Sequence, residues 1–347
     1  METNKTDIRN LSEKEIDKIV IESGEKAFRA SQIKEWIYKR GAQSFDIMTN
    51  ISKSFRDKLQ EKYCFLPSEI VNEQQSSDKT LKAVFRLHDS KYIEGVLIPS
   101  SDRVTACIST QVGCAMDCKF CATGKMGFIR NLSTGEILDQ VFLLNRRSEE
   151  LFGRALSNIV VMGMGEPLLN LDALAHAIRI ITAPKYMGMS PKRITVSSVG
   201  IPKMIMKFAD LNLKVHFSVS LHSAIDETRS AMMPVNRRNN LTELRDSIKY
   251  FHEKTNERIT YEYILFDGIN DSLKDATALA EFCKISPCKI NIIEYNSTAN
   301  DRFRRCRKEK TDAFVEFLEK RNLIINIRRS RGKDIDAACG QLAGRMQ

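Results

Sequence analysis

The stretch "ACISTQVGCAMDCKFCATGKMGFIRNLSTGEILDQVFLLNR" (residues 106–146) combines a short apolar strand pattern, a loop with three cysteines and an amphipathic helix. The strand pattern covers residues 106–110. The helix begins at Ser133 with Glu136 three residues later, which is a capping box. A strand followed by a helix is the first half of a β-α-β unit. The stretch therefore predicts a parallel sheet covered by helices.

Further apolar strand patterns follow, separated by amphipathic segments. They cover residues 158–163, 193–200, 215–222, 259–266, 289–296 and 322–330. Parallel strands need crossover connections, which alternating strands and helices supply. The span of about 230 residues is shorter than an eight-unit barrel. The predicted fold class is therefore α/β, an open partial (β/α)6 barrel rather than a doubly wound sheet.

The segments before and after this region differ in pattern. Residues 1–78 place apolar side chains such as Ile16, Val20 and Ile33 at helical spacing, which predicts a small N-terminal helical domain. Two β-rich runs within residues 79–100 predict a hairpin that links this domain to the barrel at residues 101–330. Residues 331–347 form a separate C-terminal segment.

Charge and cysteine content limit the functional class. The chain has 54 Lys and Arg against 44 Asp and Glu, and residues 301–347 alone hold 13 against 7. This excess predicts a polyanionic partner, with nucleic acid as the leading candidate and a solvated charged face as the alternative. No export signal or membrane span is visible, so we expect a cytoplasmic protein. Nine cysteines in such a protein predict metal binding or catalysis.

Cys114, Cys118 and Cys121 are separated by three and two residues, with no fourth cysteine in the loop. A structural zinc site needs four closed ligands. In a cubane iron–sulfur cluster each iron needs an outer ligand, so three thiolates would leave one iron open. The loop predicts an iron–sulfur cluster, with zinc or a structural role as the alternative. No role is predicted for the cysteines at Cys64, Cys283, Cys288 and Cys306.

Several other residues lie where the predicted strands end, namely Gly165, Glu166, Ser197, Ser220, Leu221, His222 and Asn296. Taken singly, a glycine-rich strand end is usually a turn, and a Ser or Asn there is usually a helix cap. In barrels, however, the loops at the C-terminal strand ends build the active site. Together these residues predict one binding site at the mouth of the barrel.

The cysteine spacing, with Phe120 before the last cysteine, is similar to the cluster loop of the radical S-adenosylmethionine (SAM) superfamily. In that superfamily the open iron chelates the amino and carboxylate groups of SAM, and an electron from the cluster cleaves SAM to a 5'-deoxyadenosyl radical. The resemblance implies a [4Fe–4S] cluster on the three cysteines and SAM at the strand-end residues. Glu166 would accept a hydrogen bond from the SAM ammonium.

Further motifs narrow the resemblance. The segments "GVLIPSSDRVTACISTQVGCAMDCKFCATGKMGFIRNL", "VVMGMGEPLLN", "SVSLHS", "MPVN" and "DIDAACGQLAG" resemble the RlmN/Cfr family of RNA adenine methyltransferases. The chain is more similar to the C2-methylating branch, and Cfr-like C8 methylation is the alternative. The family's substrates are an adenine in the peptidyl transferase region of 23S rRNA and an adenine beside the tRNA anticodon. The implied partners are therefore 23S rRNA, tRNA and an electron donor of the flavodoxin or ferredoxin type.

The resemblance also implies roles for residues outside the cysteine loop. By motif position, Cys339 would carry a methyl group from one SAM, and a radical made from a second SAM would take hydrogen from it. Cys107 would resolve the RNA adduct through a transient disulfide with Cys339, and Glu94 would be the base for the target carbon. On the residues alone, Glu94 is predicted to face solvent. The alternatives are a radical SAM enzyme with another substrate and a non-catalytic RNA-binding zinc protein.

Overall fold

The computed structural model describes residues 5–298 and 303–344. A ten-stranded sheet runs through it in the order β14-β13-β12-β11-β10-β9-β6-β5-β4-β3. Its strands are β3 (Glu69–Gln75), β4 (Leu81–Arg86), β5 (Tyr92–Pro99), β6 (Val104–Cys107), β9 (Asn158–Val161), β10 (Ile194–Ser198), β11 (His216–Ser220), β12 (Ile259–Leu265), β13 (Cys288–Glu294) and β14 (Ile325–Arg328). Within this sheet, β6, β9, β10, β11, β12, β13 and β14 pair in parallel, whereas β3, β4, β5 and β6 pair antiparallel. The predicted partial barrel is confirmed.

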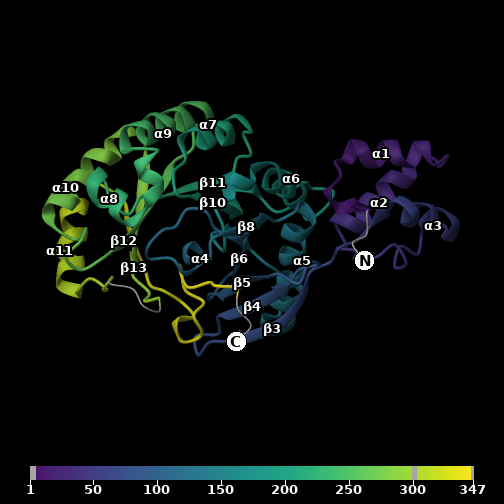
Figure 1. Ribbon diagram of the computed structural model, residues 1–347, viewed down its shortest axis with the longest axis horizontal. Coiled ribbons are helices and arrows are strands. Elements are labelled where there is room, and N and C mark those ends of the chain that lie inside the picture. The colour runs from purple at the N-terminus through teal and green to yellow at the C-terminus, as the bar shows by residue number, and fades with distance from the viewer. Residues whose placement is uncertain (1–4, 299–302, 345–347) are drawn as a thin grey trace.

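Helices cover the outer face of the parallel strands, and Figure 1 shows an arc from α6 through α7, α9 and α10 to α11. The helices are α1 (Glu13–Glu22), α2 (Phe28–Tyr38), α3 (Lys53–Lys62), α4 (Ala122–Lys125), α5 (Thr134–Phe152), α6 (Leu171–Thr182), α7 (Pro202–Asp210), α8 (Asp226–Met232), α9 (Leu241–Thr255), α10 (Leu273–Phe282) and α11 (Lys308–Glu319). The 3-10 helices are η1 (Ile8–Asn10), η2 (Pro167–Asn170), η3 (Pro191–Arg193), η4 (Pro234–Arg237), η5 (Cys283–Ile285) and η6 (Lys333–Ile335). The small sheets pair β1 (Thr6–Asp7) with β2 (Tyr63–Cys64) and β7 (Gln111–Gly113) with β8 (Phe128–Asn131).

The predicted capping box begins α5, the helix that follows the cysteine loop. The Ser133 hydroxyl accepts the Glu136 N–H at 3.2 Å, and the Glu136 carboxylate accepts the Ser133 N–H at 2.9 Å. Two N–H groups that lack intrahelical partners are thus satisfied. The barrel core is apolar between the sheet and these helices, where Val196 and Phe217 are fully buried.

The N-terminal region differs in part from its prediction. Helices α1, α2 and α3 form the expected helical domain, but residues 69–75 within the predicted domain form strand β3. The expected hairpin is present as β4 and β5. It is not a separate linker, because β5 also pairs with β6 and so extends the barrel sheet. The sequence "EIVNEQQ" of β3 is mostly polar, so this edge strand lacks the apolar alternation by which strands are predicted.

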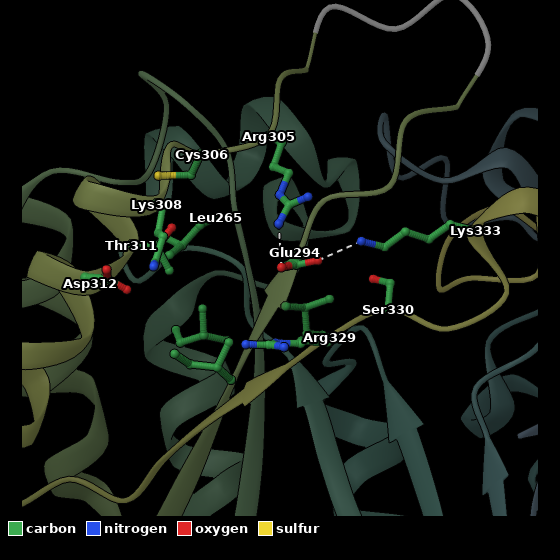
Figure 2. Close-up of a pocket in the computed structure, with 13 residues that line it drawn as sticks. Leu265, Glu294, Arg305, Cys306, Lys308, Thr311, Asp312, Arg329, Ser330 and Lys333 are labelled. Atoms are coloured by element: carbon green, nitrogen blue, oxygen red, sulfur yellow. Dashed lines mark hydrogen bonds and ion pairs between the residues drawn. The ribbon is translucent and has the colours of Figure 1, made fainter. Parts of the chain in front are cut away.

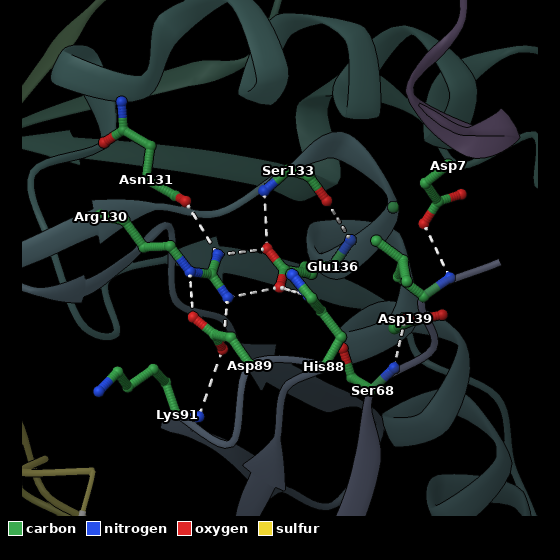
Figure 3. Close-up of polar contacts among 12 residues, drawn as sticks. Asp7, Ser68, His88, Asp89, Lys91, Arg130, Asn131, Ser133, Glu136 and Asp139 are labelled. Carbon is green, nitrogen blue, oxygen red and sulfur yellow. Dashed lines mark hydrogen bonds and ion pairs between the residues drawn. The ribbon is translucent and has the colours of Figure 1, made fainter. Parts of the chain in front are cut away.

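A buried guanidinium fixes the N-terminal domain to the barrel. Arg9 is 2% exposed and lies 2.7 Å from the Asp7 carboxylate and 2.5 Å from the Asp139 carboxylate of α5. The second Asp139 oxygen accepts the Ser68 N–H at 2.8 Å (Figure 3). A buried charge needs such a full set of partners. The two regions therefore meet at a specific polar contact.

A second polar cluster ties the β4–β5 turn to the start of α5. Arg130 donates to both oxygens of Asp89, at 2.9 and 2.8 Å, and to both oxygens of Glu136, at 2.8 and 2.9 Å (Figure 3). Bidentate pairs of this kind fix geometry as well as charge.

No helix in the described ranges is both long and apolar enough to cross a membrane.

Candidate active site

The cysteine loop leaves the barrel after β6 and is closed by the β7–β8 ribbon. Gly113 has φ 73°, and a Cβ there would lie 1.9 Å from the Gly127 oxygen, so glycine is required where the two strands approach. The Cys114 N–H donates to the same oxygen at 2.9 Å, and the Cys121 N–H donates to the Cys118 oxygen at 3.1 Å. The backbone thus holds the three predicted ligands on one short, closed loop.

The three thiols lie close enough to influence one another. Cys114 and Cys118 are buried, and Cys121 is half-buried. Burial raises the pKa of Cys114 to about 12 and the pKa of Cys118 well above its usual range, and neighbouring thiols add to both. Three ionised thiolates at this place would therefore need a positively charged group between them.

The donor set fits an iron–sulfur cluster better than a single zinc ion. Across residues 5–298 and 303–344, no three His, Cys, Asp or Glu side chains converge closely enough to hold one metal ion. Tetrahedral zinc binds all its ligands at about 2.0–2.3 Å. The thiolates of a cubane cluster stay farther apart, because each binds a different iron. Cys114, Cys118 and Cys121 could hold three irons of such a cluster.

Glu166 follows β9 in the segment "GMGEP" and is buried. Gly165 before it has φ 103°, and a Cβ there would lie 2.5 Å from the Gln111 side chain, so glycine lets this strand end contact β7. The Glu166 carboxylate accepts the Val199 N–H at 2.8 Å and the Leu168 N–H at 3.1 Å. Burial nevertheless raises its pKa to about 7. A cationic ligand group would therefore favour its ionised form.

His222 follows β11 and contacts Phe120 of the cysteine loop. The Ile264 N–H donates to its Nδ1 at 3.1 Å, which leaves the ring proton on Nε2. Burial lowers the pKa of His222 to about 3, so the ring is neutral. The ring packs edge-on against Phe120, with 5.0 Å between centroids. The neutral imidazole thus fixes the aromatic residue that precedes Cys121.

A cavity of about 160 Å³, named here the first cavity, lies at the C-terminal ends of the parallel strands. Its lining includes these residues predicted from the sequence: Cys118, Cys121, Gly165, Glu166, Ser197, Ser220 and His222. The convergence expected from their strand-end positions is present. Leu221 and Asn296 do not line it: Leu221 packs into the apolar core, and Asn296 is buried and donates to the Cys339 oxygen at 3.5 Å. Successive residues along an extended chain face opposite sides, which explains why Leu221 points into the core while its neighbour Ser220 lines the cavity.

The C-terminal segment docks across the cysteine loop. The Ala122 N–H donates to the Gly340 oxygen at 2.7 Å, beside the last cysteine. The Ala343 N–H donates to the Glu94 carboxylate of β5 at 2.8 Å. In Figure 1 this segment, in yellow, lies by β5 and α4. Two distant parts of the chain therefore meet at the cluster loop.

A second cavity of about 180 Å³ shares a wall with the first. The residues that line both are Cys121, Met162, Gly163, Ile293, Arg328, Cys339 and Gly340. Cys107, at the end of β6, lines only the second. Cys339 is exposed as a residue and lines both cavities, whereas burial of its thiol raises the pKa of that group. Burial and the nearby Cys339 raise the pKa of Cys107 to about 12. The two thiols that the resemblance pairs thus border one space.

Glu94 is buried at 3% exposure, and the solvent-facing position predicted from the residues alone is wrong. The reason is that β5 lies between β4 and β6, inside the sheet. The Glu94 carboxylate holds Ala343, and Glu94 lines neither cavity. In this conformation Glu94 anchors the C-terminal segment. Its role as a base stays a prediction.

Two charged residues that the sequence reasoning missed, Glu262 of β12 and Arg328 of β14, line the first cavity. The Asn291 amide donates to Glu262 Oε1 at 2.8 Å, while Oε2 has no hydrogen-bond donor among the described residues and lies 3.7 Å from Arg328. A buried carboxylate oxygen without a donor is costly, and it suits a ligand hydroxyl or N–H. The available signal was a single carboxylate in the apolar strand "ITYEYIL".

Arg229 of α8 was also missed, and it is fully buried. Its guanidinium donates to the Val199 oxygen at 2.6 Å, the Leu221 oxygen at 3.1 Å and the Asn236 side chain at 2.7 Å. These bonds join the ends of β10 and β11 to the segment "MPVN". Arg229 therefore sets the positions of the strand ends around the first cavity.

Comparison with known proteins agrees with this geometry. Residues 6–65 match the ribosomal RNA large subunit methyltransferase N-terminal domain, and residues 108–280 match the radical SAM superfamily. The chain is 48% identical to the probable dual-specificity RNA methyltransferase RlmN of Christiangramia forsetii, over 98% of this chain and 97% of that relative. The chain belongs to the RlmN family. The dual-specificity RNA methyltransferase RlmN of Syntrophus aciditrophicus is 43% identical over 99% of this chain and 98% of that relative.

A solved structure matches the fold over nearly the whole chain. The radical SAM methyltransferase from Sphaerobacter thermophilus has a TM-score of 0.92 and 39% identity, and the match covers 98% of this chain and all of that one. Membership in the RlmN family confirms the predicted family, fold class and enzyme class, an S-adenosylmethionine-dependent RNA methyltransferase. SAM and a [4Fe–4S] cluster are the general kind of cofactor in the radical SAM superfamily.

Proposed function

We propose that the protein methylates C2 of a specific adenine in 23S rRNA, and of an adenine beside the tRNA anticodon, with Cys339 as methyl carrier and two SAM per turnover. The observation that supports this most is the position of Cys339, which borders both cavities, whereas Cys107 borders only the second. A methyl carrier must meet the donor in one step and the target base in another. A thiol in a shared wall can do both with little movement.

The chemistry of the target carbon explains the need for a carrier. C2 of adenine is electron-poor and has no lone pair, so it cannot attack a methyl group as a nitrogen would. Held by Cys114, Cys118, Cys121 and the first cavity, a [4Fe–4S] cluster and SAM would supply the methyl group and a 5'-deoxyadenosyl radical. Glu166, Ser197, Ser220 and His222 would orient SAM there, since they line the first cavity.

Cys339 would hold the carbon as a thioether and then as a covalent bridge to the base. Loss of hydrogen from the C2 adduct releases a proton and one electron. Glu94 would accept the proton, which requires its contact with Ala343 to open, and a cluster held by Cys114, Cys118 and Cys121 would be the acceptor for the electron. Cys107 would then attack the Cys339 sulfur. The S–S bond forms, the S–CH2 bond breaks, and its electron pair stays with the carbon, which takes up a proton to become the methyl group.

The substrate adenine must reach a small space. The second cavity has a volume of about 180 Å³ and is lined by Cys107 and Cys339, so the adenine would have to leave its stack to reach Cys339. The basic C-terminal region would supply contacts to the RNA backbone. A flavodoxin- or ferredoxin-type protein would deliver electrons, and the reaction would take place in the cytoplasm, with rRNA and tRNA.

Mass spectrometry of nucleosides tests this function. Anaerobically reconstituted protein is incubated with 23S rRNA, SAM and dithionite, and the RNA is digested. We expect 2-methyladenosine from the wild type and none from Cys339→Ala, which should keep its cluster and its ability to cleave SAM. 8-Methyladenosine would instead assign the Cfr-like reaction. SAM cleavage without any methylated adenosine, in rRNA or tRNA, would refute RNA methylation.

A further inference from the structure

A groove of about 650 Å³ lies between the ends of β13 and β14 and the start of α11. Its charged lining residues are Arg305, Lys308, Arg329 and Lys333, with Glu294 and Asp312. In Figure 2, Glu294 lies between Arg305 and Lys333, with Arg329 next to it. The groove is therefore a concave surface with more cations than anions.

The cations of the groove are not equivalent. Glu294 pairs with Arg305 at 2.5 Å and with Lys333 at 2.8 Å (Figure 2), so these two cations share one carboxylate and the three groups keep a net charge of +1. Lys308 and Arg329 are exposed, and neither makes a hydrogen bond or ion pair through its side chain in the part of the chain that the structure describes. Two cations are thus free to bind an anion, and the clamped Glu294 does not compete for them.

The groove continues into the space around the reactive cysteines. Ile293, Arg329 and Ser330 line both the groove and the second cavity, which contains Cys107 and Cys339. Arg328, the preceding residue, lines the two cavities but not the groove. The end of β14 and the residue after it therefore place Arg328 at both cavities and Arg329 where the groove meets the second cavity.

We propose that this groove binds the RNA backbone next to the target adenine, with Lys308 and Arg329 contacting phosphates. The inference rests on the proposed function and adds the path of the strand that enters the second cavity. A nucleotide extruded toward Cys339 keeps its neighbours attached, so their phosphates must pass the opening that Arg329 borders. Arginine and lysine at such an opening position the strand without reading its sequence.

The test compares RNA binding by two double variants of the full-length, reconstituted protein. Lys308→Gln with Arg329→Gln removes the two unpaired cations. Lys203→Gln with Lys207→Gln removes the same charge from exposed positions on α7, at the outside of the barrel. Binding of a 23S rRNA fragment that contains the peptidyl transferase region is measured from 50 to 200 mM salt. Methylation is measured with dithionite and, separately, with a reduced flavodoxin.

Each phosphate contact on a single strand contributes about 0.7 to the salt slope, so the groove variant should lose roughly 1.4. Between 50 and 200 mM salt, the wild type and the α7 variant should then lose about sevenfold more affinity than the groove variant. SAM affinity should not change in either variant. A groove variant with the wild-type salt slope overturns the inference.

Two other outcomes have separate meanings. If the groove variant binds RNA normally and is slow only with flavodoxin, the groove docks the electron donor and the inference fails. If the wild type neither binds nor methylates RNA, the proposed function fails as well, and that result is distinct from failure of the groove alone.

Discussion

Replacing Arg229 by methionine tests whether one buried guanidinium positions the SAM site. Methionine has a similar length and no donors, so three acceptors bonded at 2.6 to 3.1 Å would lose their partner. Each loss costs about 1–3 kcal/mol, or roughly 6 kcal/mol together. Removing the charge offsets part of this, because burial lowers the pKa of Arg229 to about 10, a penalty of about 3 kcal/mol. The net destabilisation is about 3 kcal/mol, and Tm should fall by roughly 4 °C for a chain of 347 residues.

The effect on SAM should exceed the effect on folding, because the carbonyl of Val199 accepts from Arg229 while its N–H donates to Glu166. Loss of the guanidinium therefore releases the carboxylate that we assign to the SAM ammonium. We expect SAM affinity, measured by equilibrium binding to reconstituted protein, to fall at least tenfold in Arg229→Met. Arg229→Lys keeps the charge but not the bonding pattern and should show most of the same loss. Lower Tm with unchanged SAM affinity and iron content would show that Arg229 acts on stability alone.

Three further predictions follow from single contacts. The pKa of Glu166 is about 7 in the folded protein, whereas the ordinary value is 4.5. Between these two pH values the folded protein keeps a proton that the unfolded chain has lost, so the free energy of unfolding falls as pH rises from 4.5 to 7. Urea unfolding of the apo protein at pH 5 and 8 should therefore show that Glu166→Gln removes about 3 kcal/mol of that decline, and an unchanged decline would contradict the assignment. Gly165→Ala should lower the free energy of unfolding by about 2–3 kcal/mol and weaken SAM binding, because φ is 103° and a Cβ would clash with Gln111. The control Gly24→Ala, with φ 77° and open space around it, should lower that free energy by only about 1 kcal/mol. Equal losses of stability in the two variants would refute the steric argument. Thr123→Val removes a 2.7 Å bond to the C-terminal segment and should speed hydrogen exchange of residues 337–343 about fivefold, while Thr277→Val on α10 should leave it unchanged.

The sequence was most informative where a pattern repeats. The alternation of apolar strands with amphipathic helices predicted the parallel sheet, because each pair of parallel strands needs a helical crossover between them. It also predicted that Glu166, Ser197 and Ser220 would converge, since strand ends meet at one edge. Strand β3 was missed because a polar edge strand lacks an apolar repeat, and its place is decided by pairing with β4.

Single charged residues were the hardest to place. Glu262 lies in a strand buried on both faces, where alternation between polar and apolar residues no longer tells which side faces the cavity. Arg229 lies in a short helix, and its role depends on carbonyl groups from two strand ends that only the folded chain brings together. Glu94 illustrates the same limit, because its burial results from the addition of the hairpin to the barrel sheet.

The central claim is that Cys339 carries the new carbon to RNA and that Cys107 releases it. The most direct measurement is mass spectrometry of Cys107→Ala after anaerobic reaction with 23S rRNA and SAM, followed by nuclease and protease digestion. We predict a stable protein–RNA adduct in which one methylene group joins the Cys339 sulfur to adenine C2. Free protein with normal turnover, or an adduct at another residue, would contradict the account.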